Sequence, residues 1–313
     1  MSNLRQLRHA DYTIGWICAL PNLPQSSVDN NVYRLGAVHG HNIVIACLPL
    51  GVYGISSASI VATHMMNTFP EIRFSLLVGV GGGVPGISNT DIRLGDVVVS
   101  KPTGTFGGVV QYDYGKTIGN NWFQRTGALN KPPSILLAAT SRLEANYMLG
   151  ETQVPYYLSC LMDHYSTRSR FSYPGSSNDV LFEAGSEHVG SADGTCQDCS
   201  LEYVINRPLR PSSNPEIHYE TIASGNQVMR DGRMRDRVAR DLGSDILCFE
   251  MEAAGLMDNF PCLVIRGIVD YADSHKNKQW QRYASATAAA YAKELLSVIP
   301  VTHIAPSPRA HIE

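Results

Sequence analysis

Apolar runs and amphipathic segments alternate along most of the chain, and they predict strands and helices in turn. Apolar runs of strand length predict buried strands at 12–20, 73–86, 94–102 and 261–273. Two strand-like halves that meet at HGHN predict a hairpin at 32–49, and a strand leading into a helix is predicted at 246–260. Helical spacing predicts helices at 54–69, 134–149, 233–242 and 280–299. This alternation indicates a mostly parallel sheet covered on both faces.

A polar segment interrupts the pattern. Residues 166–216 are rich in Ser, Gly, Asn and Pro, which predicts a long excursion away from the core. We therefore expect a single domain over 12–300 with an insertion at about 166–216, flanked by tails at 1–11 and 301–313.

Composition narrows the class of protein. The 313 residues are 44% hydrophobic with a net charge of −3, which suits a large core and gives no general attraction to nucleic acid. The seven cysteines lie mostly in apolar runs, and the N-terminus has no apolar signal segment. Residues 42–63 are uncharged but broken by Pro49 and several glycines, so a membrane span is not expected. We expect a cytoplasmic protein without nucleic-acid or membrane partners.

The sequence GVGGGVPG (79–86) follows a predicted strand. Its consecutive glycines allow positive φ and let backbone N–H groups approach a ligand, although such a cluster is as often only a tight turn. No Lys-Ser or Lys-Thr pair follows, and Pro85 interrupts any dinucleotide-binding fingerprint. The segment is therefore neither of the common phosphate-binding loops.

Asp270 ends the apolar run at 261–273. In open α/β sheets, ligands bind beyond the carboxyl ends of the strands. A carboxylic acid placed there and partly shielded from water can act as a general acid. The alternative is that Asp270 caps the following turn, a role for which Asp273 competes.

Two carboxylates interrupt the apolar run that follows residue 245. Glu250 and Glu252 lie two residues apart, so on an extended segment they point the same way, with Met251 on the opposite side. Buried carboxylates need donors, because an unpaired one is costly. The donors are either the hydroxyls of a sugar or a buried arginine such as Arg266.

Cys196 and Cys199 form a lone C-x-x-C within the polar segment, and His188 is the nearest further ligand candidate. Such a pair is half of a zinc site, a redox pair or an incidental feature of a variable loop. Because no second C-x-x-C exists, we expect incidental cysteines and no metal.

These segments, in this order, resemble the nucleoside phosphorylase and nucleosidase superfamily, in the branch of the methylthioadenosine/adenosylhomocysteine nucleosidases and the hexameric purine nucleoside phosphorylases. The resemblance covers about 12–299 and is carried by VGVGGGVPG with DIRLGDVVVS, by FEMEAAGL and by RGIVDYAD. Segments such as YTIGWICALP and GNQVMRDG look like the fungal version of this domain, which often forms the N-terminal part of larger receptor-like proteins. The resemblance implies a three-layer α/β/α sandwich with a mixed, partly closed central sheet, and a homo-oligomer.

The resemblance also implies roles for individual residues. Glu252 would bind the sugar hydroxyls, and Asp270 would be the general acid that protonates purine N7. Further substrate contacts are implied for Glu250, Met251, Gly81, Gly82, Asn226, Val228, Met229 and Trp280. No cofactor is implied, although phosphate is a candidate co-substrate.

The attacking nucleophile is water or phosphate. Phosphorylases of this group carry an Arg where this chain has Leu77, which favours water. The nucleosidases hold that water with a Glu whose matching position here is Leu23, in a shortened segment. We therefore expect hydrolysis of the N-glycosidic bond of a purine nucleoside or nucleotide of the adenosine or ATP type. A catalytically impaired sensor module is the alternative.

Cationic residues bear on whether the ligand is a nucleoside or a nucleotide. Four of them flank the expected pocket segments and could meet a charged 5′ group: Arg230, Arg233, Lys276 and Lys278. Exposed Lys and Arg are common, so a solvated surface is the favoured interpretation.

Overall fold

The computed structural model describes residues 7–18, 29, 31–86, 90–119, 122–191, 194–243 and 246–301. Its strands are β1 (Ile14–Cys18), β2 (Tyr33–Val38), β3 (His41–Cys47), β4 (Phe74–Gly83), β5 (Val97–Ser100), β6 (Val109–Gln111), β7 (Gly115–Ile118), β8 (Trp122–Arg125), β9 (Ile217–Ser224), β10 (Ile246–Glu250) and β11 (Cys262–Asp270). Its α-helices are α1 (Ile55–Thr68), α2 (Ser134–Met148), α3 (Val154–Met162), α4 (Tyr165–Phe171), α5 (Gly232–Leu242) and α6 (Gln281–Val298).

Nine of the described strands form one sheet, in the order β10-β9-β5-β11-β4-β1-β3-β2, with β6 added to β9. Most neighbours are parallel, but β2 pairs antiparallel with β3 and β5 with β11. β10 pairs with β9 on one side and antiparallel with β4 on the other, at Cys248–Gly83 and Phe249–Gly82. Strands β4, β11, β5, β9 and β10 therefore close into a ring, and the predicted mixed, partly closed sheet is confirmed.

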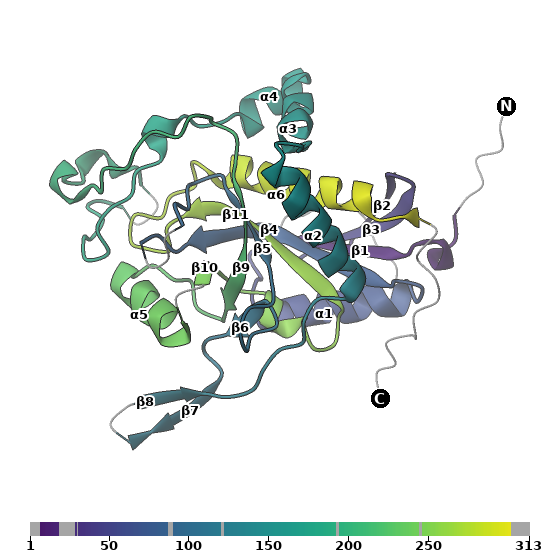
Figure 1. Cartoon of the computed structure of the whole chain (residues 1–313). Helices are drawn as coiled ribbons and strands as arrows, with labels where there is room; N and C mark the ends of the chain where they lie inside the picture. Colours follow the sequence, from purple (N-terminus) through teal and green to yellow (C-terminus); the bar gives the residue numbers. More distant parts are fainter. Residues whose placement is uncertain are drawn as a thin grey trace.

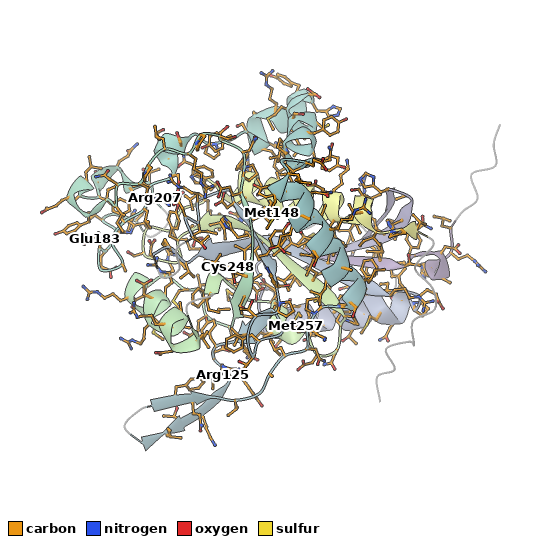
Figure 2. All side chains as sticks on the ribbon, in the orientation of Figure 1. Arg125, Met148, Glu183, Arg207, Cys248 and Met257 are labelled. Carbon is orange, nitrogen blue, oxygen red and sulfur yellow. The ribbon has the colours of Figure 1, made fainter. Side chains whose placement is uncertain are left out.

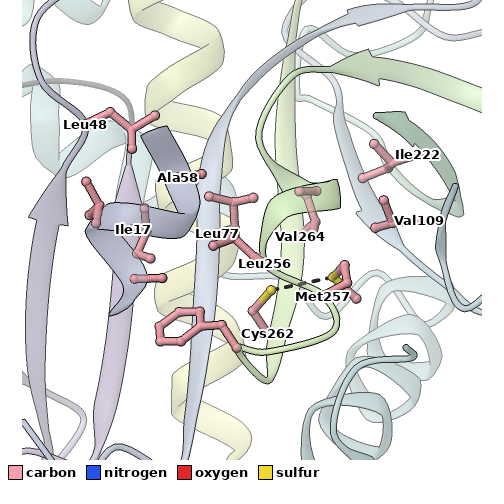
Figure 3. Packing of buried hydrophobic residues seen from close by; sticks show 14 of the residues in the cluster. Ile17, Leu48, Ala58, Leu77, Val109, Ile222, Leu256, Met257, Cys262 and Val264 are labelled. Carbon is pink, nitrogen blue, oxygen red and sulfur yellow. Dashed lines mark hydrogen bonds between the residues drawn. The ribbon is translucent and has the colours of Figure 1, made fainter. Parts of the chain in front are cut away.

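Helices cover both faces of this sheet. α1 lies along one face, while α2 and α6 lie across the other (Figure 1). On the α1 side, Ile17, Leu77 and Val264 of three neighbouring strands pack with Ala58 of α1 (Figure 3). On the other side, α2 and α6 contribute Leu136 and Ala288, among others, to a second core. The three-layer α/β/α arrangement follows from these two cores.

The sequence explains why β11 lies inside this sheet. All of its residues are buried, and a strand covered by helices on both faces needs apolar side chains on both sides. α6 approaches it closely through small residues such as Ala284. Gly267 has no side chain there, and an added Cβ would collide with the backbone carbonyl of Ala284.

Two predicted elements differ from the structure. β4 continues through Gly83, so the glycine run is strand and not a turn, because its backbone pairs with β10 and β11. The helix predicted after Glu252 is a 3₁₀ turn at Ala253–Gly255. Gly255 packs there against the backbone of Ile55 at the start of α1, and the chain then reverses into β11.

The polar segment lies beyond the strand ends. After α4 it contains short 3₁₀ helices at Ser176–Asn178, Cys196–Asp198 and Leu201–Tyr203, and an isolated bridge between Phe182 and Val204. Figure 2 shows Glu183 and Arg207 in these loops at one edge, and Cys248 near the middle of the molecule. Within the described parts of the chain, no helix is both long and apolar enough to cross a membrane.

The predicted terminal tails fall largely on residues that the structure does not describe. Within the first tail, His9–Asp11 form a 3₁₀ helix, and the His9 ring lies 4.8 Å from the Phe69 ring between centroids. Of the second tail, only Val301 is among the described residues.

Candidate active site

A cavity of about 520 Å³ lies where β4, β10 and β11 end. Several segments that the sequence analysis singled out, far apart along the chain, meet there. The predicted site residues in its lining are Gly81, Gly82, Val228, Met229, Glu250, Met251, Glu252 and Asp270. This position, beyond the carboxyl ends of parallel strands, is the usual ligand position in open α/β sheets.

One buried guanidinium holds both carboxylates of the E-M-E segment. Arg266 projects from β11 and is 1% exposed. Its Nη2 donates to Oε2 of Glu250 and, at 3.1 Å, to Oε2 of Glu252. We name Glu250, Glu252 and Arg266 the Arg266 cluster. The buried arginine considered from the sequence is therefore present.

The two carboxylates of the Arg266 cluster are not equivalent. Glu250 also accepts the backbone N–H groups of Glu252 and Ala253, at 3.0–3.1 Å. Glu252 accepts one further bond, from the N–H of Gly54 at 3.3 Å. A carboxylate has about four lone-pair sites, so Glu252 keeps acceptor capacity at the cavity while Glu250 is largely engaged.

Burial raises the pKa of Glu252 above its ordinary value; Arg266 opposes this shift, and the charge of Glu250 adds to it. A single buried cation thus serves two carboxylates. Such an arrangement favours a ligand that brings its own donors, as vicinal hydroxyl groups do.

The glycines of β4 form one wall of the cavity. A Cβ at Gly81 would collide with Sγ of Cys248 and lie 2.8 Å from the carbonyl oxygen of Phe249. A Cβ at Gly82 would lie 2.9 Å from Oδ1 of Asp270. The sequence suggested that these glycines adopt positive φ. In the structure they are part of the extended strand β4, and their lack of a side chain lets neighbouring residues approach its backbone closely.

Asp270 uses its two oxygens differently. It is the last residue of β11 and is 4% exposed. Oδ1 accepts the N–H of Ala272 at 2.9 Å, so Asp270 does cap the following turn. Oδ2 lies 2.8 Å from Nζ of Lys276, which also lines the cavity. A ligand atom that approaches Oδ2 must therefore share it with the Lys276 ammonium or displace that ammonium.

Val228 and Met229 lie on a loop that is fixed by a hydrogen bond from Tyr112. The hydroxyl of Tyr112 donates to the carbonyl oxygen of Gln227 at 3.2 Å. Met229 is buried, whereas Val228 is 41% exposed and lines the cavity mouth with it. Both side chains are apolar, which suits a flat aromatic ligand.

Asn226 serves the fold. Its Oδ1 accepts the N–H of Ile55 at the start of α1, at 3.2 Å, and its own N–H donates to Oδ2 of Asp113 at 2.7 Å. In the described part of the structure it is not among the lining residues of the cavity. Asn226 therefore positions α1 and the loop before Val228, where the resemblance implied a substrate contact.

Trp280 also differs from its expected place. Its side chain is 1% exposed, its Nε1 donates to the carbonyl oxygen of Asn178 at 3.0 Å, and it packs with Val269 and Tyr283. The indole stands outside the described lining of the cavity, and Gln281 lines it in its place. The helix start thus turns the indole toward the polar segment.

The sequence analysis missed the segment after β3. Residues 48, 49 and 51–53 line the cavity, and Tyr53 offers an aromatic ring that is 59% exposed. The available signal was their place directly after a parallel strand, at the same sheet edge as Asp270.

The structure describes only one of the two positions, Leu77 and Leu23, from which the nucleophile was predicted. Leu77 is 2% exposed and belongs to the core beside α1. Leu23 lies outside the described residues, so its proposed consequence stays a prediction. Of the four flanking cations, Arg230, Lys276 and Lys278 line the cavity, whereas Arg233 is not in its described lining.

Comparison with known proteins places these features in context. No family model matches the chain. The chain is 43% identical over 318 residues to a nucleotide-binding leucine-rich repeat (NLR)-like protein of Hyaloscypha variabilis, a match that covers 96% of this chain and 31% of the relative. The chain thus spans less than a third of that protein.

Two nucleosidases are further relatives. The 5′-methylthioadenosine/S-adenosylhomocysteine nucleosidase of Mycobacterium tuberculosis is 23% identical over 310 residues, covering 92% of this chain and 97% of the relative. A 74-residue segment, 22% of this chain, is 39% identical to 14% of the ATP nucleosidase Cap17 of Escherichia coli.

Solved structures share the fold. The 5′-methylthioadenosine/S-adenosylhomocysteine nucleosidase of Neisseria meningitidis, in complex with methylthio-immucillin-A, matches with a TM-score of 0.56 at 16% identity, covering 91% of this chain and 98% of that one. The futalosine hydrolase of Helicobacter pylori matches with a TM-score of 0.51 at 15% identity, covering 92% and 98%. The chain therefore has the fold of these nucleosidases, and its motifs and relatives are similar to those of the nucleoside phosphorylase and nucleosidase superfamily.

Proposed function

We propose that the chain cleaves the N-glycosidic bond of a purine nucleoside or nucleotide by hydrolysis. The observation that carries this proposal is that Glu252, which follows β10, and Asp270, which ends β11, line one cavity. The relatives named as nucleosidases support hydrolysis of this bond. The wall of glycines beside Asp270 supports close access of a ligand to the carboxylates.

Each acidic residue has a distinct role in the proposed reaction. Glu252 accepts hydrogen bonds from ribose hydroxyls, and Arg266 holds it in place. Once the ligand displaces the Lys276 ammonium from Oδ2, Asp270 takes up a proton there. It donates this proton to N7 as the bond from C1′ to purine N9 breaks, so that the base leaves without a full negative charge. Water adds to C1′ and loses a proton, which completes the hydrolysis.

Water is the proposed nucleophile because Leu77 is buried in the core where the phosphorylases carry an Arg. Two cations that line the cavity, Arg230 and Lys278, favour a nucleotide over a nucleoside as the ligand. The lining holds four cations against three carboxylates, which supports an anionic 5′ group. No cofactor takes part in the proposed step.

A second function has its own support. The relative from Hyaloscypha variabilis is a nucleotide-binding leucine-rich repeat (NLR)-like protein, of which this chain matches 31%. A module that binds the same ligand without turnover would suit such a protein, and Leu23 stands where a water-holding Glu is expected. Turnover separates the two functions.

The experiment measures release of free base by chromatography. The purified chain is incubated with adenosine, inosine, methylthioadenosine, AMP or ATP, each with and without phosphate, beside Asp270→Asn. We expect release without phosphate, and a loss of about 100-fold or more in the variant, because a general acid contributes about that much. Release only with phosphate would contradict hydrolysis. A folded chain that binds these ligands without release would support the sensor module.

We also propose that the chain forms a homo-oligomer. The hairpin of β7 and β8 projects from the body of the molecule (Figure 1). Ile118 and Phe123 on it are 42% and 44% exposed, and exposed apolar side chains on an arm favour burial against another subunit. Light scattering should give a mass above that of one chain, and a monomer at high concentration would contradict this.

A further inference from the structure

The polar segment gathers three metal-binding side chains at one place. His188, Cys196 and Cys199 each offer one ligand atom, and these atoms lie within 4.8 Å of one another. Cys199 is buried and the other two are half-buried. The sequence analysis expected incidental cysteines, but incidental residues do not need to converge across a loop.

The distances fit zinc after a small closure. Zinc bonds are about 2.3 Å to sulfur and about 2.0 Å to nitrogen, so tetrahedral ligand atoms lie about 3.5–3.8 Å apart. The three atoms therefore need to move by about 1 Å at most. One imidazole and two thiolates are ligands that zinc prefers, and oxygen-seeking ions such as Mg²⁺ do not suit them.

The surroundings point to an absent ligand. Nε2 of His188 is buried and has no hydrogen-bond partner in the described structure. The backbone N–H of Val189 points at Sγ of Cys199, at 3.5 Å, as N–H groups do toward metal-bound thiolates. Both thiols are free.

The loop has few buried apolar residues of its own. Between residues 172 and 215, the buried apolar residues of the described chain are Leu181, Phe182 and Cys199. A segment without a core of its own is commonly held by a metal or a disulfide. Closing a loop with a metal adds its binding free energy to folding.

The same loop borders the proposed active site. The N–H of His188 donates to Oγ of Ser274 at 3.0 Å, and that hydroxyl donates to the carbonyl oxygen of Ser186 at 3.3 Å. Sγ of Cys196 lies 4.0 Å from the carbonyl oxygen of His275. The three ligands thus rest against the segment that follows Asp270.

We propose that His188, Cys196 and Cys199 bind one zinc ion, with a water molecule in the fourth position. The ion fixes His188 and the two cysteines against residues 274–275. This inference does not depend on the proposed hydrolysis, and its test uses no enzyme assay.

The test measures metal on the whole chain. Protein purified with reductant is loaded with zinc and desalted, and zinc is counted by mass spectrometry. We expect one zinc per chain in the wild type and in Cys160→Ser, a matched control in α3, and none in Cys199→Ser or His188→Ala. Cobalt(II) in place of zinc should give thiolate charge-transfer absorption in the wild type and in Cys160→Ser alone.

A chelator gives a second readout, for which the wild type alone is decisive. It should lower the Tm of the wild type and of Cys160→Ser, and leave the Tm of Cys199→Ser unchanged. A folded wild type that retains no zinc would overturn the proposal, and so would equal zinc in Cys199→Ser. A Cys196–Cys199 disulfide, located by peptide mapping of protein purified with reductant, would overturn it as well.

Discussion

Two buried acidic clusters of this sheet differ in the number of donors that each carboxylate receives. Asp96 is 1% exposed. It accepts hydrogen bonds from both terminal nitrogens of Arg210, at 2.7 and 2.8 Å, and from Nε2 of His218, at 2.9 Å. It also accepts the backbone N–H groups of Arg93 and Glu216. In the Arg266 cluster, by contrast, one nitrogen of one guanidinium serves two carboxylates.

The pKa shifts follow this difference. Burial acts to raise the pKa of Asp96, but the bonds from His218 and Arg210 outweigh it and lower that pKa. The pKa of Glu252 is raised. None of Asp96, Arg210 and His218 is in the described lining of the cavity, whereas all of the Arg266 cluster is. A surplus of acceptors over donors therefore distinguishes the cluster that lines the cavity from the one that does not.

The largest expected effect is that of Arg266→Met. This change leaves two buried carboxylates without their cation and should cost about 3–5 kcal/mol of unfolding free energy at pH 7. Urea unfolding measures it. The lost stability should partly return as the pH falls, because carboxyls that take up protons in the folded state need no cation. An equal loss at pH 7 and pH 5 would contradict the account of the cluster.

Asp96→Asn is expected to have a smaller effect, of about 2–3 kcal/mol, because Arg210 is 14% exposed and water can reach it once its partner is neutral. Below its melting temperature the variant should keep the ligand affinity of the wild type, measured by calorimetry with the active ligand. A large loss of affinity in a folded Asp96→Asn protein would remove the distinction between the two clusters.

The smallest effect should have the opposite sign. Glu252→Gln removes a carboxylate whose ionised form is destabilised by burial. At pH 7 the unfolding free energy of the variant should therefore equal that of the wild type or exceed it by about 1 kcal/mol. Because the pKa of Glu252 is raised, its contribution to wild-type stability is present at low pH and is lost as the pH rises through that pKa. The advantage of the variant should therefore shrink on acidification.

Thermal unfolding of both proteins at pH 7 and pH 5 measures this difference. The base-release assay should show that the same change removes most of the activity. A variant that is much less stable than the wild type at pH 7 would show that Glu252 serves the fold as Asp96 does.

Local patterns in the sequence predicted most of the elements. β11 and α6 are long, and their apolar positions repeat at the period of a strand or a helix, so burial follows directly from the sequence. The two carboxylates before Ala253 were visible as an interruption of an apolar run. The resemblance then predicted that these carboxylates and Asp270 lie in the same site.

Pairing between distant segments was not predictable in the same way. The glycines at 81–83 looked like a turn because nothing local shows that β10 pairs with them. Trp280 and Asn226 have environments set by Asn178 and Ile55, which lie far from them in the chain. The convergence of His188 with the two cysteines likewise depends on how a polar loop folds back on itself.

The pairing of β10 with β4 has a consequence for the order of folding. It joins residues 82–83 to residues 248–249, and contacts between such distant segments form late because a long loop must close first. β1 to β4 can pair while the rest of the chain is still being synthesised, but the wall of the cavity cannot. The chain must therefore be synthesised beyond Asp270 before the cavity is complete. Binding of a ligand in the cavity would then report that β10 has paired with β4.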